Sequence, residues 1–174
     1  MTDMRQVQDS KPQPSIRRFA GIVAVFVVLG PPVGGLAISI LLATLAASSD
    51  LAVDGWMART RMFSGMLLLG TAFGLPLSYI VGGVPALLIG VATAAWDARK
   101  GVISLHVALG GALALGGLAA LRQGDPAWAS EGERIAQLAM LLAHLTAAGL
   151  CWLVARVIFG RPAVSSRSGM GENQ

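Results

Sequence analysis

Residues 76–90 read PLSYIVGGVPALLIG, and an earlier segment at 30–35 reads GPPVGG. Both place proline and paired glycine inside stretches, 62–96 and 19–47, that are apolar enough to cross a bilayer. Proline removes a backbone donor and kinks or breaks a helix. In membrane helices such interruptions are tolerated where neighbouring groups satisfy the freed backbone. The two segments therefore predict packed, discontinuous or kinked helices rather than plain membrane anchors.

The composition around these segments is typical of a membrane protein. Only 13% of the 174 residues are charged and 55% are hydrophobic, whereas soluble domains carry about 25% charged residues. Glycine accounts for 22 residues, and small residues let membrane helices approach closely. The formal charge of +4 comes from basic residues at segment ends. We therefore expect these residues to indicate the orientation of the helices in the membrane, and we expect no nucleic-acid partner. The predicted fold is an all-α, polytopic membrane helix bundle.

We expect about four transmembrane helices in a domain at 19–159, between a cytoplasmic tail at 1–18 and a disordered cytoplasmic tail at 160–174. The apolar stretches of this domain are 19–47, 62–96, 102–121 and 134–159.

The stretch 62–96 is too long for one straight span, because about 20 residues cross the hydrocarbon core. It forms either two short half-helices or an interfacial helix followed by one span. We favour a membrane-associated or broken leading piece at 62–75 and a span at 77–96. The break is expected at Gly74–Leu75–Pro76, since proline disfavours helix immediately before it.

The distribution of basic residues supports four crossings with both termini in the cytoplasm. Nine of the 13 Lys and Arg residues lie in the N-terminal tail, the turn at 99–100 and the C-terminal end, which share one side after four crossings. The other side receives the remaining four together with five of the nine acidic residues. Cytoplasmic loops carry the excess of Lys and Arg, so the first side is predicted to be cytoplasmic.

The candidate functional or packing residues come from the two Pro/Gly segments and one histidine. They are Pro31, Pro32, Gly34, Gly35, Tyr79, Gly82, Gly83, Pro85 and His144. One interpretation is that broken helices free backbone groups to line a substrate or ion site. The other is a kink with close packing, which we favour because no charged residue accompanies the breaks. For Tyr79 we favour an interfacial or interhelical hydrogen bond.

His144 is the one ionisable side chain that the pattern places at mid-membrane, which makes it the best single functional candidate. We nevertheless favour a neutral His144 that is hydrogen-bonded between helices. His106 would differ from it in depth by roughly 8 Å, a poor match for a shared metal or haem site. Cys151 is the single cysteine, and no Cys/His/carboxylate spacing points to zinc. We expect no metal, no cofactor and no catalytic residue.

Asp97 is expected to cap the following turn or to pair with a neighbouring base.

Short motifs occur in a particular order over most of residues 17–155. They are Arg17–Arg18, Gly30–Pro31–Pro32 with Gly34–Gly35, Tyr79, Gly82, Pro85–Ala86–Leu87, Gly90, Asp97 and Cys151–Trp152. In this order the chain resembles a family of small uncharacterised multi-pass proteins from bacterial inner membranes. The resemblance implies location in the bacterial inner (plasma) membrane and about four spans. It carries over no catalytic or binding residue.

These features predict a non-enzymatic structural or accessory subunit that packs with itself or with a membrane-protein partner in the lipid bilayer. The segment GGALALGGLAAL at 110–121 offers a small-residue face, with Gly110, Ala114 and Gly117 at helical spacing. The alternative is a small transporter or channel component with its site at the two Pro/Gly segments. A polar cavity where these segments meet, with Tyr79 or His144 inside, would favour that alternative. A third and weaker interpretation is a membrane enzyme or haem-binding subunit.

Overall fold

The computed structural model describes residues 15–48, 55–122 and 130–160. These residues form four helices and no strand: α1 (Ile16–Ser48), α2 (Trp56–Lys100), α3 (Leu105–Leu121) and α4 (Glu131–Phe159). The predicted all-α helix bundle is therefore confirmed. Most of the two predicted tails lies outside the described residues. Of the first tail, Ile16, Arg17 and Arg18 belong to α1, so this helix begins earlier than expected.

Three of the helices are long and apolar enough to cross a membrane: α1 with 33 residues, α2 with 45 and α4 with 29. The chain is accordingly an integral membrane protein. The apolar helix α3 has 17 residues, which is about 26 Å at 1.5 Å per residue. This is near the lower limit for a hydrocarbon core about 30 Å thick. A fourth full crossing stays a prediction.

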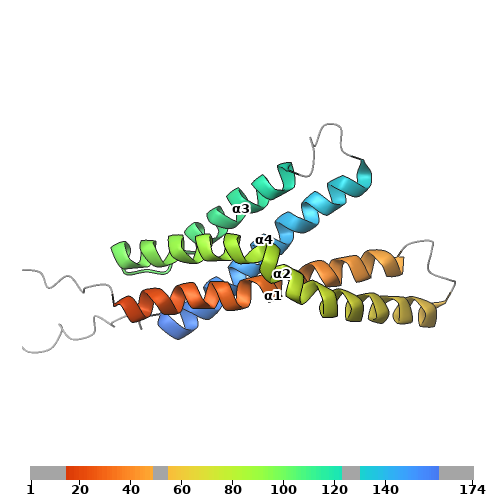
Figure 1. The fold of residues 1–174 in the computed structure, drawn as a ribbon, viewed down its shortest axis with the longest axis horizontal. Helices are drawn as coiled ribbons and strands as arrows, with labels where there is room; N and C mark the ends of the chain where they lie inside the picture. The colour runs from red at the N-terminus through yellow and green to blue at the C-terminus, as the bar shows by residue number, and fades with distance from the viewer. Residues whose placement is uncertain (1–14, 49–54, 123–129, 161–174) are drawn as a thin grey trace, which may run out of the picture.

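The helix α2 is continuous through Pro76 and Pro85, so the predicted break at Gly74–Leu75–Pro76 is wrong. Figure 1 shows a bend in the middle of α2 in place of a break. A proline removes one helical hydrogen bond and bends the helix, and packed neighbours make this tolerable in a membrane bundle. The predicted leading piece at 62–75 is the first part of this same helix.

The helices α1 and α2 form an antiparallel hairpin along a seam of small residues. A Cβ placed on Gly90 would lie 2.9 Å from Phe26 Cβ, and one on Gly30 would lie 3.1 Å from Ala86 Cβ. Only glycine at these positions lets the two backbones approach this closely. The seam continues past the prolines, since a Cβ on Gly70 would lie 3.0 Å from the Ser39 hydroxyl.

The helices α3 and α4 form a second hairpin, and the two hairpins come together at one end of the molecule and separate at the other (Figure 1). We call the first the closed end; here α1 begins, α2 ends, α3 begins and α4 ends. We call the second the open end; it consists of the α1–α2 tip and the α3–α4 tip. Apolar residues of all four helices and of the α2–α3 turn are buried together in one cluster.

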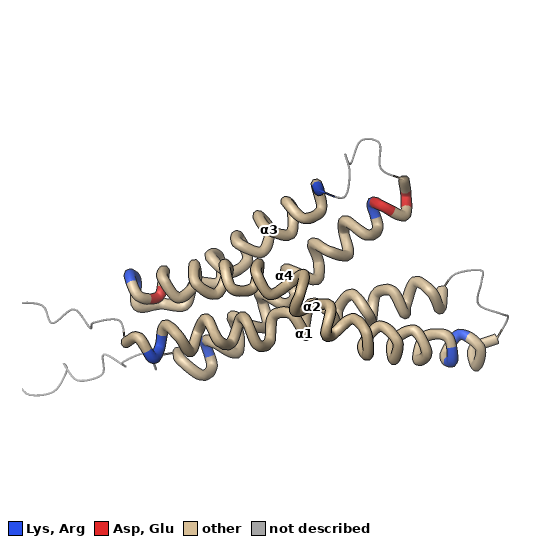
Figure 2. Tube along the Cα trace, in the orientation of Figure 1, with Lys and Arg blue, Asp and Glu red and all other residues tan. Residues whose placement is uncertain are grey.

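Charged residues of the described chain lie at these ends and not between them (Figure 2). The closed end carries Arg17, Arg18, Asp97, Arg99, Lys100 and Arg156. The two tips of the open end carry Arg59, Arg61, Arg122, Glu131, Glu133 and Arg134. The long uncharged middle is what a bilayer requires of the segments that it surrounds.

Candidate functional site

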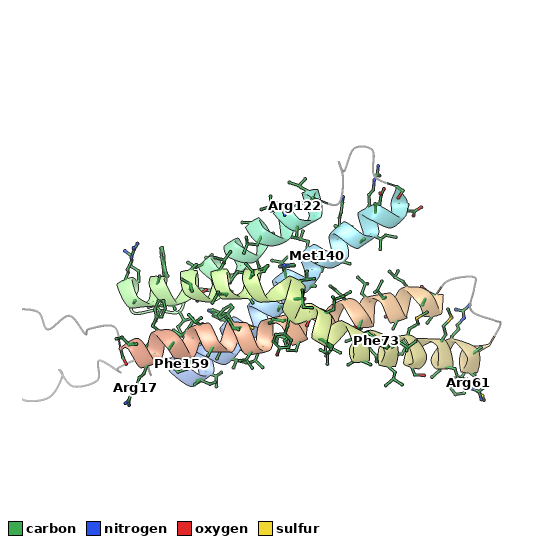
Figure 3. All side chains as sticks on the ribbon, viewed as in Figure 1. Arg17, Arg61, Phe73, Arg122, Met140 and Phe159 are labelled. Atoms are coloured by element: carbon green, nitrogen blue, oxygen red, sulfur yellow. The ribbon has the colours of Figure 1, made fainter. Side chains whose placement is uncertain are left out.

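A cavity of about 390 Å³ lies where the two hairpins diverge, and we call it the fork cavity. Its size falls within the range of about 300–1,000 Å³ that is usual for small-molecule sites. Side chains of α1, α2 and α4 line it, among them Phe73 and Met140, which Figure 3 labels on the two hairpins. The cavity is therefore built by elements that are far apart in the sequence.

Six of the nine candidate residues line the fork cavity: Pro31, Gly34, Gly35, Gly82, Pro85 and His144. The two Pro/Gly segments meet directly, because a Cβ placed on Gly82 would lie 3.7 Å from Pro31 Cα. The other three candidates, Pro32, Gly83 and Tyr79, are not among the lining residues.

The lining of the fork cavity is mostly apolar. Its hydroxyl groups are those of Ser39 and Ser78, and both bond to the backbone of their own helices. Ser39 Oγ donates to Gly35 O at 2.9 Å, and Ser78 Oγ donates to Leu75 O at 2.7 Å. No Asp, Glu, Lys or Arg is among the lining residues that the structure describes. The fork cavity is thus suited to an apolar occupant rather than to an ion.

His144 is the most polar side chain of the lining, and its hydrogen bond differs from the expected one. Its Nδ1 lies 2.8 Å from Met140 O, one turn back in α4. A carbonyl oxygen only accepts, so Nδ1 carries the proton and Nε2 is left as an acceptor in the neutral ring. The expected bond between helices is therefore replaced by one within α4. Gly116 of α3 makes room for the ring, since a Cβ there would lie 3.2 Å from His144 Cβ.

Tyr79 forms the interhelical hydrogen bond that we favoured for it. Its hydroxyl donates to Val28 O at 2.9 Å. In an uninterrupted helix this carbonyl would accept from the N–H of residue 32, but Pro32 has no N–H. Tyr79 of α2 therefore supplies the donor that Pro32 removes from α1. This contact supports the packing interpretation of the breaks, in which a neighbour satisfies the freed backbone.

The closed end contains an ion pair whose partners are 79 positions apart. Arg18 Nε donates to Asp97 Oδ2 at 2.6 Å and Arg18 Nη2 donates to Asp97 Oδ1 at 2.9 Å. The side chain of Asp97 is 5% exposed and that of Arg18 is 19% exposed. The base is on α1 rather than in the adjacent turn. An antiparallel arrangement of the first two apolar stretches, which brings the start of one beside the end of the other, is the signal that could have found this pair.

The closed end is also joined through α4. The Trp152 indole N–H donates to Ile103 O, in the turn before α3, at 3.1 Å. The Phe159 ring lies directly on Gly21 of α1. Residues on α1, α4 and the α2–α3 turn thus hold this end together, and neither of these contacts was predicted.

The helix α3 has glycines on two sides. On its inner side, a Cβ on Gly111 would lie 3.3 Å from Ile89 Cγ1, and Gly116 faces His144. On its outer side, Gly110 and Ala114 are exposed, and a Cβ on Gly110 or Gly117 would meet nothing within 4 Å. We call Gly110, Ala114 and Gly117 the outer α3 face.

Comparisons with known protein families, with curated proteins and with solved structures find no match to this chain. Among the described residues, no group of three or more His, Cys, Asp or Glu is placed to hold a metal ion. Three features are left to indicate function: the fork cavity, the outer α3 face and the closed end.

Proposed function

We propose that the chain is a non-enzymatic accessory subunit of the inner membrane, which associates with a second copy or a membrane-protein partner through the outer α3 face. The observation that carries this proposal is the open space outside Gly110 and Gly117. Small residues at this spacing let a second helix approach closely, and lipid provides no comparable packing.

The inner side of α3 supports the proposal by showing how this helix uses glycine. Gly111 and Gly116 admit Ile89 and His144 to short distances, so small residues on α3 serve close contact wherever a neighbour is present. The outer α3 face has the same residue types at helical spacing and has no neighbour within the described chain.

The charges support an orientation with the closed end in the cytoplasm. The helix α1 begins and α4 ends at this end, and five of its six described charged residues are basic. The excess of Lys and Arg is expected on the cytoplasmic side. The resemblance implies a bacterial inner membrane. With the closed end on its cytoplasmic side, both termini are predicted to be cytoplasmic.

The test is to block the outer α3 face with large side chains. We expect Gly110→Leu combined with Gly117→Leu to lower the mass of the complex isolated in mild detergent, because Leu keeps a second helix away. The matched control is Gly65→Leu with Gly149→Leu, which also adds two side chains where nothing lies within 4 Å. An unchanged mass for G110L/G117L, measured by native mass spectrometry, contradicts the proposal.

A second candidate is a small transporter component, and the meeting of the two Pro/Gly segments at the fork cavity favours it. The apolar lining suits an apolar solute rather than an ion. The test places a single cysteine at position 144 in a Cys151→Ala background and measures its reaction with a membrane-impermeant maleimide. Reaction faster than that of a cysteine at exposed Leu150 indicates a hydrated pathway. Equally slow reaction at both positions counts against a pathway.

A further inference from the structure

The closed end has more positive charge than its one carboxylate neutralises. Among the described residues, Asp97 is the only acid there, and both of its oxygens are occupied by Arg18. Four exposed cations remain at this end: Arg17, Arg99, Lys100 and Arg156. None of the four has a salt bridge to a described residue, since the described chain contains the Arg18–Asp97 pair alone.

Two of these cations flank the contact between α1 and α4. The Phe159 ring lies on Gly21; Arg17 is one turn before Gly21, and Arg156 is about one turn before Phe159. Residues one turn apart share a helix face, so Arg17 lies on the side of this contact toward the start of α1, and Arg156 lies on its other side, toward the middle of α4. Figure 3 labels Arg17 and Phe159 together at the closed end. We call Arg17 and Arg156 the basic seam.

Arg156 is held in position rather than free in solvent. Its guanidinium lies 5.2 Å from the centroid of the Trp152 ring, within the range for attraction between a cation and an aromatic face. The Trp152 indole is itself fixed by its hydrogen bond to Ile103 O. The stack is built on the helix rather than on a mobile loop, and it leaves the N–H donors of Arg156 available to an anion.

The surroundings of the basic seam are apolar and exposed. Ile16 is 84% exposed, Val157 77% and Ile158 60%. A partner that fits must bring negative charge to the arginines and hydrocarbon to these side chains at the same time. Small soluble anions offer only the negative charge. Anionic phospholipids offer both, and basic clusters at the ends of transmembrane helices bind their headgroups.

We propose that the basic seam binds the phosphate headgroup of an anionic phospholipid, with the lipid chains along the apolar surface beside it. The site requires neither the outer α3 face nor the fork cavity. It makes the closed end a lipid-specific contact rather than only a boundary of the membrane.

The test compares phosphatidylglycerol with phosphatidylcholine on the detergent-solubilised full chain, with bound lipid measured by native mass spectrometry. We expect phosphatidylglycerol to bind in preference. Replacing Arg17→Gln and Arg156→Gln together should weaken its binding by roughly thirtyfold, about fivefold for each cation. The matched control, Arg59→Gln with Arg61→Gln, removes the same charge from the open end and should retain the affinity.

Three results would overturn or support the proposed lipid site. Equal loss in the R59Q/R61Q control overturns the proposal, because net charge would then explain binding. Competition by inorganic phosphate as strong as that by the lipid overturns the choice of a lipid. If R17Q/R156Q does not fold, Arg17→Lys with Arg156→Lys keeps the charge, and selective phosphatidylglycerol binding by that variant supports the proposal.

Discussion

The closed and open ends are made of the same four helices but are held in different ways. At the closed end, directional contacts hold the helices: a two-pronged ion pair from Arg18 of α1 to Asp97 of α2, and a hydrogen bond from Trp152 of α4 to Ile103 O in the α2–α3 turn. At the open end the hairpins separate around the fork cavity. Polar contacts that are shielded from water fix geometry strongly, whereas apolar surface can face either protein or lipid.

The difference between the two ends indicates which substitutions should change the free energy of unfolding most. Each hairpin is fixed by its own small-residue seam, as at Gly90 with Phe26 in α1–α2 and Gly116 with His144 in α3–α4. Between the hairpins, the closed end adds the Phe159 ring of α4 on Gly21 of α1 and the hydrogen bond from Trp152 of α4 to the α2–α3 turn. Variants that break the ion pair of the closed end should therefore change stability most, and variants of the small-residue seam and of the Tyr79 hydrogen bond should change it less.

The largest effect is expected from breaking the ion pair. Asp97→Ala leaves Arg18 without its partner in a site that is mostly buried, and this should lower the free energy of unfolding by about 3 kcal/mol. The measurement is reversible unfolding in mixed micelles with increasing sodium dodecyl sulfate.

The double variant R18L/D97L separates pairing from burial. It removes both charges and should recover most of the loss, since apolar replacements of a buried pair are often neutral or better. Arg134→Ala at the open end should have little effect. If D97A is as stable as the unaltered chain, the ion pair does not hold the closed end together.

A smaller effect should distinguish two adjacent glycines at the fork. Alanine at either position gains helix propensity of about 1 kcal/mol. A Cβ on Gly35 would lie 2.9 Å from Ser78 Cβ, but one on Gly34 has its nearest contact at 3.8 Å, Ala147 Cβ. Overpacking costs about 1–3 kcal/mol, so Gly35→Ala should be less stable than Gly34→Ala by about 2 kcal/mol. Equal stabilities in the same micellar assay would show that the hairpin seam relaxes freely at this point.

Sequence alone was sufficient for the helical membrane class, and it identified the two Pro/Gly segments as packing elements without predicting that they meet. Both depend on local properties, namely apolar length and the position of small residues and prolines. The seams they form are visible in the structure at Gly82 against Pro31. The same local reasoning was wrong about the break at Pro76, because the loss of one hydrogen bond does not end a helix whose side is packed against α1.

The contacts of the closed end depend on distant residues. Nothing near Asp97 in the sequence identifies Arg18 as its partner, since the nearer Arg99 and Lys100 match its charge equally well. The rotation of each helix about its axis decides which base faces Asp97, and the packing of the helices sets that rotation. For the same reason the Trp152 bond to Ile103 O and the position of Phe159 on Gly21 were not foreseen.

The smallest effect concerns the Pro31–Pro32 site of α1, between the two ends. Tyr79→Phe removes the donor to Val28 O and should lower the free energy of unfolding by about 1 kcal/mol, as is typical of hydrogen bonds between membrane helices. Pro32→Ala restores the N–H that this carbonyl would otherwise accept from. In the P32A background, Tyr79→Phe should therefore cost nearly nothing. The four unfolding free energies form a double-mutant cycle, and an equal cost in both backgrounds would mean that Tyr79 acts through packing instead. A coupling close to the full value of about 1 kcal/mol would identify Tyr79 as the group that makes Pro32 tolerable within α1.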